Sequence, residues 1–242
     1  MGESDGRIDA VLVDVGGVFC APSHEALTAV IEAAGGRATP DTLDRGHYAG
    51  AAAIDAHATE ETIDWKSYGA AVARAAGVPE DRIEEAASGV VSALSSGHGW
   101  NRVLPGSIDG LKELAATGVR LGIVSNSDGT VAEQLVSHGV CQVGEGEGVP
   151  VAVVIDSAVV GIRKPDPGIF DLALEALGVP AERAAHVGDT IFADVAGARA
   201  AGVRPYHLDP YGFCPFRQDH DHVRSLTDLA SVVARSRKSH RP

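Results

Sequence analysis

Short apolar runs alternate with amphipathic helical stretches along the second half of the chain. After Pro105 and Gly106, each helical stretch ends at a glycine and is followed by a run of apolar residues. A similar run near the start, residues 8–13, is bounded by polar residues and glycine, as in a strand buried on both faces. Strands separated by helices of this length predict an α/β fold built on a parallel sheet. The expected later strands are 119–124, 151–155, 184–187 and 203–208, and the expected helices are 108–115, 130–138, 167–177 and 191–201.

The region that follows the first strand has a different pattern. Residues 23–97 are rich in alanine, and apolar side chains such as Trp65, Tyr68 and Val72 recur at helical spacing. Pro79 is placed for the first turn of a further helix. An insertion directly after the first strand lies at the carboxyl edge of the sheet, where open α/β folds bind their ligands. We therefore expect an α/β core domain, 1–18 and 100–242, and an all-helical domain, 19–99, placed to act as a lid.

Composition and charge limit the partners of this chain. It has 242 residues, 45% of them hydrophobic, which is enough for one good core and a smaller second one. The formal net charge of −13 argues against sequence-independent binding to nucleic acid or to an anionic membrane. No stretch reaches about 18 uninterrupted apolar residues, and residues 1–6 are polar and acidic. We expect a cytoplasmic protein that holds any anionic ligand in a local site; no pattern predicts its oligomeric state.

The cysteines and the basic C-terminal segment show no pattern of a functional site. Cys20, Cys141 and Cys214 form no CxxC pair and no Cys/His spacing typical of zinc, so we expect free thiols in a reducing compartment. Residues 235–242 are basic and almost free of apolar side chains, which predicts a solvated tail.

Polar side chains follow four of the expected strands, at or just beyond the point where each strand ends. Because the carboxyl ends of neighbouring parallel strands meet at one edge of a sheet, we expect the four loops to converge. Each cluster alone has an ordinary explanation as a turn, a loop, a surface charge or a helix cap, but their shared placement favours a site. The clusters are Asp14 before Gly16 and Gly17, Ser125 with Asn126, Lys164, and Asp189 with Asp194.

The residue types in this patch suit magnesium and a phosphoryl group. Asp14 and Asp189 offer hard oxygen ligands of the kind that Mg²⁺ prefers. Ser125 and Lys164 can donate hydrogen bonds and positive charge to phosphoryl oxygens. Main-chain N–H groups beside the two glycines of the first loop can approach the same group closely, because glycine has no Cβ.

Four segments of the chain carry a resemblance to a known family. They are DVGGV (14–18), VSNS (124–127), GIRKPDPGIF (161–170) and HVGDTIFADVAGARAAG (186–202). In this order they resemble the motifs of the haloacid dehalogenase superfamily of hydrolases, in the branch with a helical cap, over residues 8–208. The resemblance implies a Rossmann-like parallel sheet and hydrolysis of a phosphate ester.

The resemblance also implies a role for each of the candidate residues. Asp14 would attack phosphorus and form an aspartyl phosphate that water hydrolyses. Lys164 would bridge the nucleophile and the phosphoryl group. Ser125, Asn126 and the turn at Gly17 would bind the phosphoryl group. Asp14, Asp189 and the Gly16 carbonyl would bind Mg²⁺. Asp194 would either support the metal site or ligate the metal directly.

Gly16 is the departure from the family pattern. Most phosphatases of the family carry a second Asp here, which serves as the general acid and base, a role typically worth about 10² to 10⁴ in rate. Three responses remain open: a good leaving group, an acid supplied from elsewhere, or a reaction other than phosphate ester hydrolysis. Candidates for a replacement acid are His24, His47, Asp55 and His57.

We therefore expect a Mg²⁺-dependent phosphatase acting on a small phosphorylated metabolite, with three alternatives. A 2-haloacid dehalogenase also lacks the second Asp, but it needs neither Asp189 nor Asp194, and no arginine shortly follows Phe19 to receive halide. A phosphonatase would need a cap lysine, and Lys66 is the only lysine of the insert. A non-catalytic binding protein would not require all of the candidate residues. The substrate itself is not predicted.

Overall fold

The computed structural model describes residues 6–57, 63–95 and 99–238. Contacts between residues divide the chain into two compact units. The first unit comprises Met1–Phe19, Pro105–Leu208 and Arg217–Pro242, and the second comprises Cys20–Leu104 and Asp209–Phe216. Among the described residues, no helix combines the length and the apolar character needed to cross a membrane.

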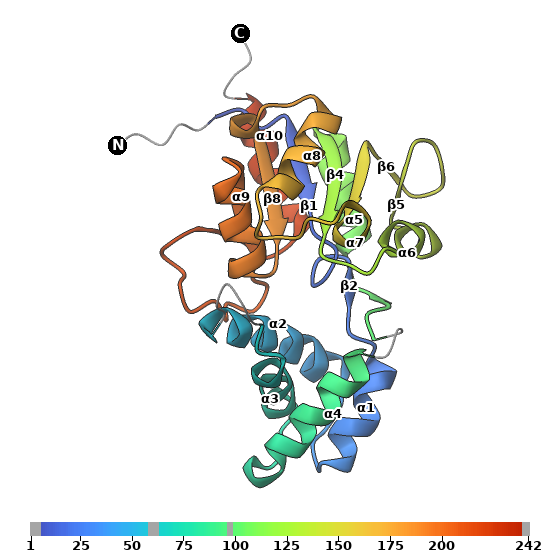
Figure 1. Cartoon of the computed structure of the whole chain (residues 1–242), viewed down its shortest axis with the longest axis vertical. Helices are drawn as coiled ribbons and strands as arrows, with labels where there is room; N and C mark the ends of the chain where they lie inside the picture. The colour runs from blue at the N-terminus through green and yellow to red at the C-terminus, as the bar shows by residue number, and fades with distance from the viewer. Residues whose placement is uncertain (1–5, 58–62, 96–98, 239–242) are drawn as a thin grey trace. The chain divides into compact units, whose positions relative to one another are not determined.

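A six-stranded sheet forms the centre of the first unit (Figure 1), with strand order β10-β9-β8-β1-β4-β7. Every neighbouring pair in it is parallel, which confirms the predicted α/β fold class. Its strands are β1 (Ala10–Val13), β4 (Arg120–Ser125), β7 (Val153–Asp156), β8 (Ala184–Gly188), β9 (Arg204–Leu208) and β10 (Asp221–Val223).

Helices of the first unit pack their apolar side chains against this sheet. In one core cluster, Leu12 of β1 joins Ile169, Phe170 and Leu177 from a helix that ends at Gly178. The glycine has φ 61°, a left-handed conformation that closes helices readily because it has no Cβ. The helices are α5 (Ser107–Ala116), α6 (Val131–Ser137), α7 (Ser157–Val160), α8 (Gly168–Leu177), α9 (Ala196–Ala200) and α10 (Leu226–Lys238), with a short 3₁₀ turn at Ala181–Arg183.

Three local predictions need correction in this unit. The expected strand 151–155 is split between β7 and a separate strand, β6 (Val149–Val151), which pairs in parallel with β5 (Cys141–Val143). The expected helix 191–201 begins as a π-helical segment, Ile191–Val195, before α9. The predicted solvated tail was wrong for its first four residues, because they complete α10.

Tertiary contacts of the chain end explain why the tail prediction failed. Ser236 is buried, and its hydroxyl donates to the Val233 carbonyl and accepts from Ile8 N. Arg237 donates to the Ile8 carbonyl and to Asp9. Ser236 and Arg237 therefore fix α10 to the entry of β1. Residues 239–242 lie outside the described residues.

The described residues of the second unit are mainly α-helical. Their shared core contains Leu27, Ile31, Tyr68 and Val72. A Cβ added at Gly50 would lie 2.5 Å from the Tyr68 ring, so this glycine permits close packing of two helices. The elements are α1 (His24–Ala33), α2 (Pro40–His57), α3 (Trp65–Ala75) and α4 (Ile83–Ser95), with a two-stranded antiparallel ladder of β2 (Cys20–Ala21) and β3 (Arg102–Val103).

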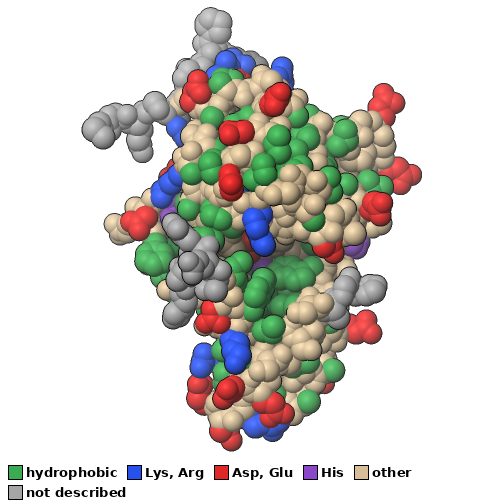
Figure 2. Space-filling view, viewed as in Figure 1, with side chains coloured by type: hydrophobic (Ala, Val, Ile, Leu, Met, Phe, Trp, Pro, Cys, Tyr) green, Lys and Arg blue, Asp and Glu red, His purple; other side chains and the backbone are tan. Residues whose placement is uncertain are grey.

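Pro79 does not lie in the first turn of α4 but precedes a separate 3₁₀ turn, Glu80–Arg82. Surface charge follows the composition. Figure 2 shows Lys and Arg side chains scattered among Asp and Glu side chains on one face of the molecule. They do not gather into one basic patch on this face.

Candidate active site

The carboxyl edge of the sheet brings the predicted residues of the first unit into one region. β1 pairs with β4 on one side and with β8 on the other, and Val13 is level with both Ile123 and Val187. Asp14 follows β1 directly, Ser125 ends β4, and Asp189 follows β8. All three are buried, with 4% to 7% of their surface exposed. The convergence expected from the sequence is therefore observed.

Lys164 joins two of the carboxylates. Its Nζ lies 2.7 Å from Asp14 Oδ1 and 2.6 Å from Asp194 Oδ1, and its side chain is only 2% exposed. Burying ions is costly unless each finds a partner and its remaining donors or acceptors are satisfied. The ammonium thus neutralises one charge and holds the two carboxylates in a fixed relation.

The main chain of Lys164 is fixed by Asn126. Asn126 Nδ2 donates to the Lys164 carbonyl at 2.9 Å, and Lys164 N donates to Asn126 Oδ1 at 2.8 Å. These paired bonds bracket the peptide from both sides. The resemblance predicts Asn126 beside the phosphoryl group, whereas in the structure its amide holds the main chain of Lys164. One of the two Nδ2 protons takes no part in these two bonds.

Asp194 is surrounded by donors from four directions. Oδ1 accepts from Lys164 Nζ and lies 2.9 Å from His186 Nε2, while Oδ2 accepts from the Thr190 hydroxyl at 2.6 Å and from Thr190 N at 3.1 Å. A Cβ added at Gly188 would lie 2.5 Å from Oδ2, so only glycine lets the carboxylate lie against β8. Both oxygens of Asp194 are therefore engaged in hydrogen bonds.

A π-helical segment presents Asp194 to the site. The Thr190 carbonyl accepts from both Asp194 N and Val195 N at 3.2 Å, so the first turn of Ile191–Val195 is wider than an α-helical turn. Single π turns of this kind occur often at functional sites. Sequence periodicity alone predicted an ordinary helix here.

Burial and neighbouring charges shift the pKa values in opposite directions. Burial raises the pKa of Asp14, Lys164 lowers it, and Asp194 and Asp189 raise it again, to about 7. Burial alone would lower the pKa of Lys164, but Asp14 and Asp194 raise it to about 12. Burial would also raise the pKa of Asp194, yet Lys164 and His186 hold it well below its usual range. Burial lowers the pKa of His186.

The donor set fits a hard divalent cation. Carboxylate oxygens of Asp14, Asp189 and Asp194 lie within 4.8 Å of one another, and all three residues are buried. Lys164 pairs with two of these acids, Asp14 and Asp194. Oxygen ligands of this kind suit Mg²⁺, which completes its shell with water and substrate.

The remaining predicted residues of the first unit border the same region. Gly16 is partly exposed, whereas Gly17 is buried and has φ 67°, a left-handed turn that favours glycine.

The Asp189 carbonyl accepts from His207 Nε2 at 3.1 Å. Asp156, although also buried at a strand end, accepts from Gly129 N and Ala158 N and is therefore a structural cap.

The four candidates for a replacement acid all belong to the second unit. His24 Nε2 lies 3.2 Å from Asp44 Oδ1. His47 is 2% exposed, and its Nδ1 lies 2.9 Å from the Tyr68 hydroxyl, which indicates a structural role. Asp55 and His57 lie in the last turn of α2. Replacement of the missing acid by one of them stays a prediction.

Sequence reasoning missed two residues that contact Asp194, His186 and Thr190. Both stand within the fourth segment, immediately around Asp189. The alternation of a strand could have indicated that His186 and Gly188 face the same side of β8. The wide turn that brings Asp194 back to them had no sequence signal.

Comparison with known proteins supplies the family. A model of haloacid dehalogenase-like hydrolases matches residues 8–202. The chain belongs to the haloacid dehalogenase-like hydrolase family. The resemblance predicted from the four segments is therefore confirmed, and so is the prediction that the chain is an enzyme of this hydrolase class.

Curated relatives of this family match only part of the chain. The phosphoglycolate phosphatase of Rhodospirillum rubrum is 39% identical over 111 residues, which are 46% of this chain and 43% of that protein. The phosphoserine phosphatase of Thermus thermophilus is 40% identical over 100 residues, 41% of this chain and 37% of that protein. The matched part thus spans less than half the length of either relative.

Solved structures of the family share the fold over nearly the whole chain. A HAD phosphatase from Thermococcus onnurineus has a TM-score of 0.57 at 22% identity and covers 93% of this chain and 98% of its own. A 2-haloacid dehalogenase from Pseudomonas syringae has a TM-score of 0.54 at 22% identity and covers 94% and 99%. Because the two proteins are named for different reactions, this fold alone does not choose between them.

Proposed function

We propose that this hydrolase is a Mg²⁺-dependent phosphatase that acts on a small phosphorylated metabolite through an aspartyl phosphate on Asp14. The observation that carries the proposal is the buried contact of 2.7 Å between Lys164 Nζ and Asp14 Oδ1. A carboxylate attacks a phosphoryl group only when it is ionised, and an adjacent ammonium favours the ionised form. The same ammonium offers its remaining donor to an incoming phosphoryl oxygen.

The residues of the chain divide the reaction into two displacements. An oxygen of Asp14 forms a bond to phosphorus while the bond to the leaving-group oxygen breaks, and that oxygen takes up a proton. A water oxygen then attacks phosphorus, the Asp14–phosphorus bond breaks, and inorganic phosphate leaves with the carboxylate restored. Ser125 and Lys164 bind the phosphoryl oxygens through both steps.

The carboxylates next to the nucleophile support the metal requirement. Asp14, Asp189 and the main-chain carbonyl of Gly16 would hold Mg²⁺, and Asp194 would support the metal site by fixing Lys164. When bound, the cation screens the repulsion between an anionic nucleophile and an anionic phosphoryl group.

Two further parts of the proposal concern domains and substrate. We propose that residues 19–99 act as a cap domain on a core of 1–18 and 100–242, and that the cap excludes bulk water from the reaction. The relatives named for phosphoglycolate and phosphoserine support a small phosphorylated substrate. Because Gly16 provides no acid, the leaving group either departs with little help or takes its proton from another residue or from water.

A metal-independent dehalogenase is the second candidate, and Gly16 favours it. In that reaction Asp14 would displace halide from carbon, and no acid would be needed at position 16. The buried Asp189 and the engaged Asp194 speak against it, because the attack on carbon requires no set of three carboxylates.

Phosphate release from sugar phosphates, acyl phosphates and phosphoglycolate, and halide release from 2-haloacids, each with and without Mg²⁺, test the proposal. We expect Mg²⁺-dependent phosphate release that Asp14→Asn abolishes, while Asp171→Asn, the same change on the exposed side of α8, leaves it intact. Halide release that persists in EDTA would identify the dehalogenase instead. Retention of phosphate release by purified Asp14→Asn would exclude the covalent mechanism.

A further inference from the structure

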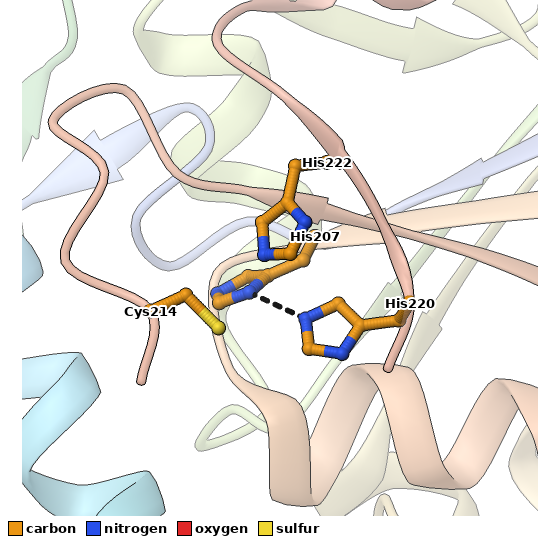
Figure 3. Close-up of side chains that lie close together, drawn as sticks. All are labelled: His207, Cys214, His220 and His222. Carbon is orange, nitrogen blue, oxygen red and sulfur yellow. Dashed lines mark hydrogen bonds between the residues drawn. The ribbon is translucent and has the colours of Figure 1, made fainter. Parts of the chain in front are cut away.

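His207 of β9 meets His220 and His222, at the start of β10, in one cluster (Figure 3). His207 and His222 are register partners in these parallel strands, and His220 precedes β10 by one residue. Their ring centroids are separated by 5.1 Å, 5.2 Å and 4.4 Å, and one ring nitrogen of each lies within 4.8 Å of the others. All three belong to the first unit.

The hydrogen bonds of His207 fix which nitrogen carries its proton. Nε2 faces the Asp189 carbonyl at 3.1 Å, and a carbonyl only accepts, so Nε2 is protonated. In the neutral ring Nδ1 is then a bare nitrogen, and it lies 3.0 Å from His220 Nε2. A histidine whose second nitrogen is held by a carbonyl is the usual form of a metal ligand.

The donor atoms of this cluster are imidazole nitrogens. Neutral imidazole is the form that binds metals. Three nitrogen donors differ from the oxygen donors around Asp14, and imidazole suits zinc whereas carboxylate suits magnesium.

We propose that His207, His220 and His222 form a zinc site that is separate from the magnesium site of the proposed phosphatase. In a tetrahedral zinc site with Zn–N bonds of about 2.0–2.1 Å, ligand nitrogens lie about 3.3 Å apart. The observed 3.0 Å between His207 Nδ1 and His220 Nε2 requires only a small opening of the pair. Zinc takes the place of the shared proton, which moves to the other nitrogen of His220.

Cys214, also drawn in Figure 3, lies in segment 209–216 of the second unit, and the site is placed on the histidines alone. Neither a CxxC pair nor a Cys/His spacing typical of zinc marks this cluster in the sequence. His207 lies far from the His220–His222 pair along the chain, and only the pairing of β9 with β10 joins them.

Titration of the EDTA-treated full chain with Zn²⁺ by calorimetry tests this site. Every protein compared also carries Asp14→Asn, which removes one carboxylate from the cluster of Asp14, Asp189 and Asp194 and so weakens zinc binding there. We expect one zinc bound per chain, with an affinity that falls by at least about tenfold in His222→Gln and about 100-fold or more in the double variant His220→Gln, His222→Gln. His138→Gln, the same change at the end of α6, is the matched control and keeps the full affinity.

The nature of the ligands provides a second measurement that needs no histidine variant. X-ray absorption at the zinc edge of the one-zinc protein must show imidazole nitrogens around the metal. A shell of oxygen atoms alone, the absence of zinc binding, or equal affinities for the control and the folded double variant would each overturn the proposal. Circular dichroism establishes that the double variant is folded.

Discussion

Lys164 Nζ lies 2.7 Å from Asp14 Oδ1, although the two residues come from opposite halves of the chain. The lysine reaches this position because Asn126 brackets its peptide and Asp194 pairs with the same ammonium. A nucleophile, its cationic partner and the residue that fixes that partner therefore form one connected unit. Each of its links leads to a measurable expectation.

Lys164→Met should remove activity and lower stability. The change leaves Asp14 and Asp194 buried without their cation, and breaking a buried ion pair from one side costs about 3–5 kcal/mol in the free energy of unfolding. Chemical denaturation at pH 7 measures this cost, and phosphate release measures the rate. Lys112→Met, at an exposed ion pair of 3.6 Å on α5, is the control and should change neither quantity appreciably. Equal stability of the two variants would show that the buried pair contributes nothing.

Thr190→Val should destabilise the chain more than the same change at Thr130. Thr190 donates to Asp194 Oδ2 from its hydroxyl at 2.6 Å and its N at 3.1 Å, and Thr130 donates to Asp128 Oδ1 at the same two distances. Water replaces the lost donor at the exposed Asp128 but not at the buried Asp194. We expect a loss of about 1–3 kcal/mol for Thr190→Val and about 0.5 kcal/mol for Thr130→Val. Denaturant midpoints of the two variants provide the comparison, and equal losses would contradict it.

Magnesium should stabilise the protein more at pH 8 than at pH 5. Without a cation, the pKa of Asp14 is raised to about 7, above its value of about 4 in the unfolded chain. The folded state therefore binds more protons than the unfolded state between these values, and the contribution of Asp14 to stability is lost as pH rises through this window. Mg²⁺ competes with that proton and removes the penalty of ionisation.

The melting temperature with Mg²⁺ minus that with EDTA, measured from pH 5 to pH 8, checks this expectation. The difference should increase with pH in the wild type. It should become nearly independent of pH in Asp14→Asn, which has no proton to lose at this position. A magnesium effect that is constant with pH in the wild type would mean that Asp14 is not a ligand.

The fold was predictable because its signals are local. Apolar runs such as 8–13 and glycines that close helices mark the strands and helices of the sheet without any long-range information. The helix α10 could also have been predicted, since Leu226, Leu229, Ala230 and Val233 are buried at spacings of a helical face. Its basic last turn, read as a tail, concealed this pattern.

The parts of the site that escaped prediction depend on contacts between distant segments. Asp194 meets His186 and Lys164 only because a π turn follows β8 and because Gly188 leaves room for the carboxylate. No spacing along the sequence encodes that arrangement. The same holds for His207 and His222, which become neighbours through strand pairing.

Gly16→Asp should extend the substrates to those with poor leaving groups. An aspartate at this position could protonate the leaving oxygen, and general acid catalysis is typically worth about 10² to 10⁴ in rate. Gly16→Asn fills similar space but cannot act as an acid, so it is the control for steric effects. The ratio of rates on an alkyl phosphate and on an acyl phosphate, compared between the two variants, isolates the contribution of the proton. If this ratio is the same in both variants and in the wild type, the acid is already supplied from elsewhere. Replacing His24, His47, Asp55 and His57 one at a time would then identify its source.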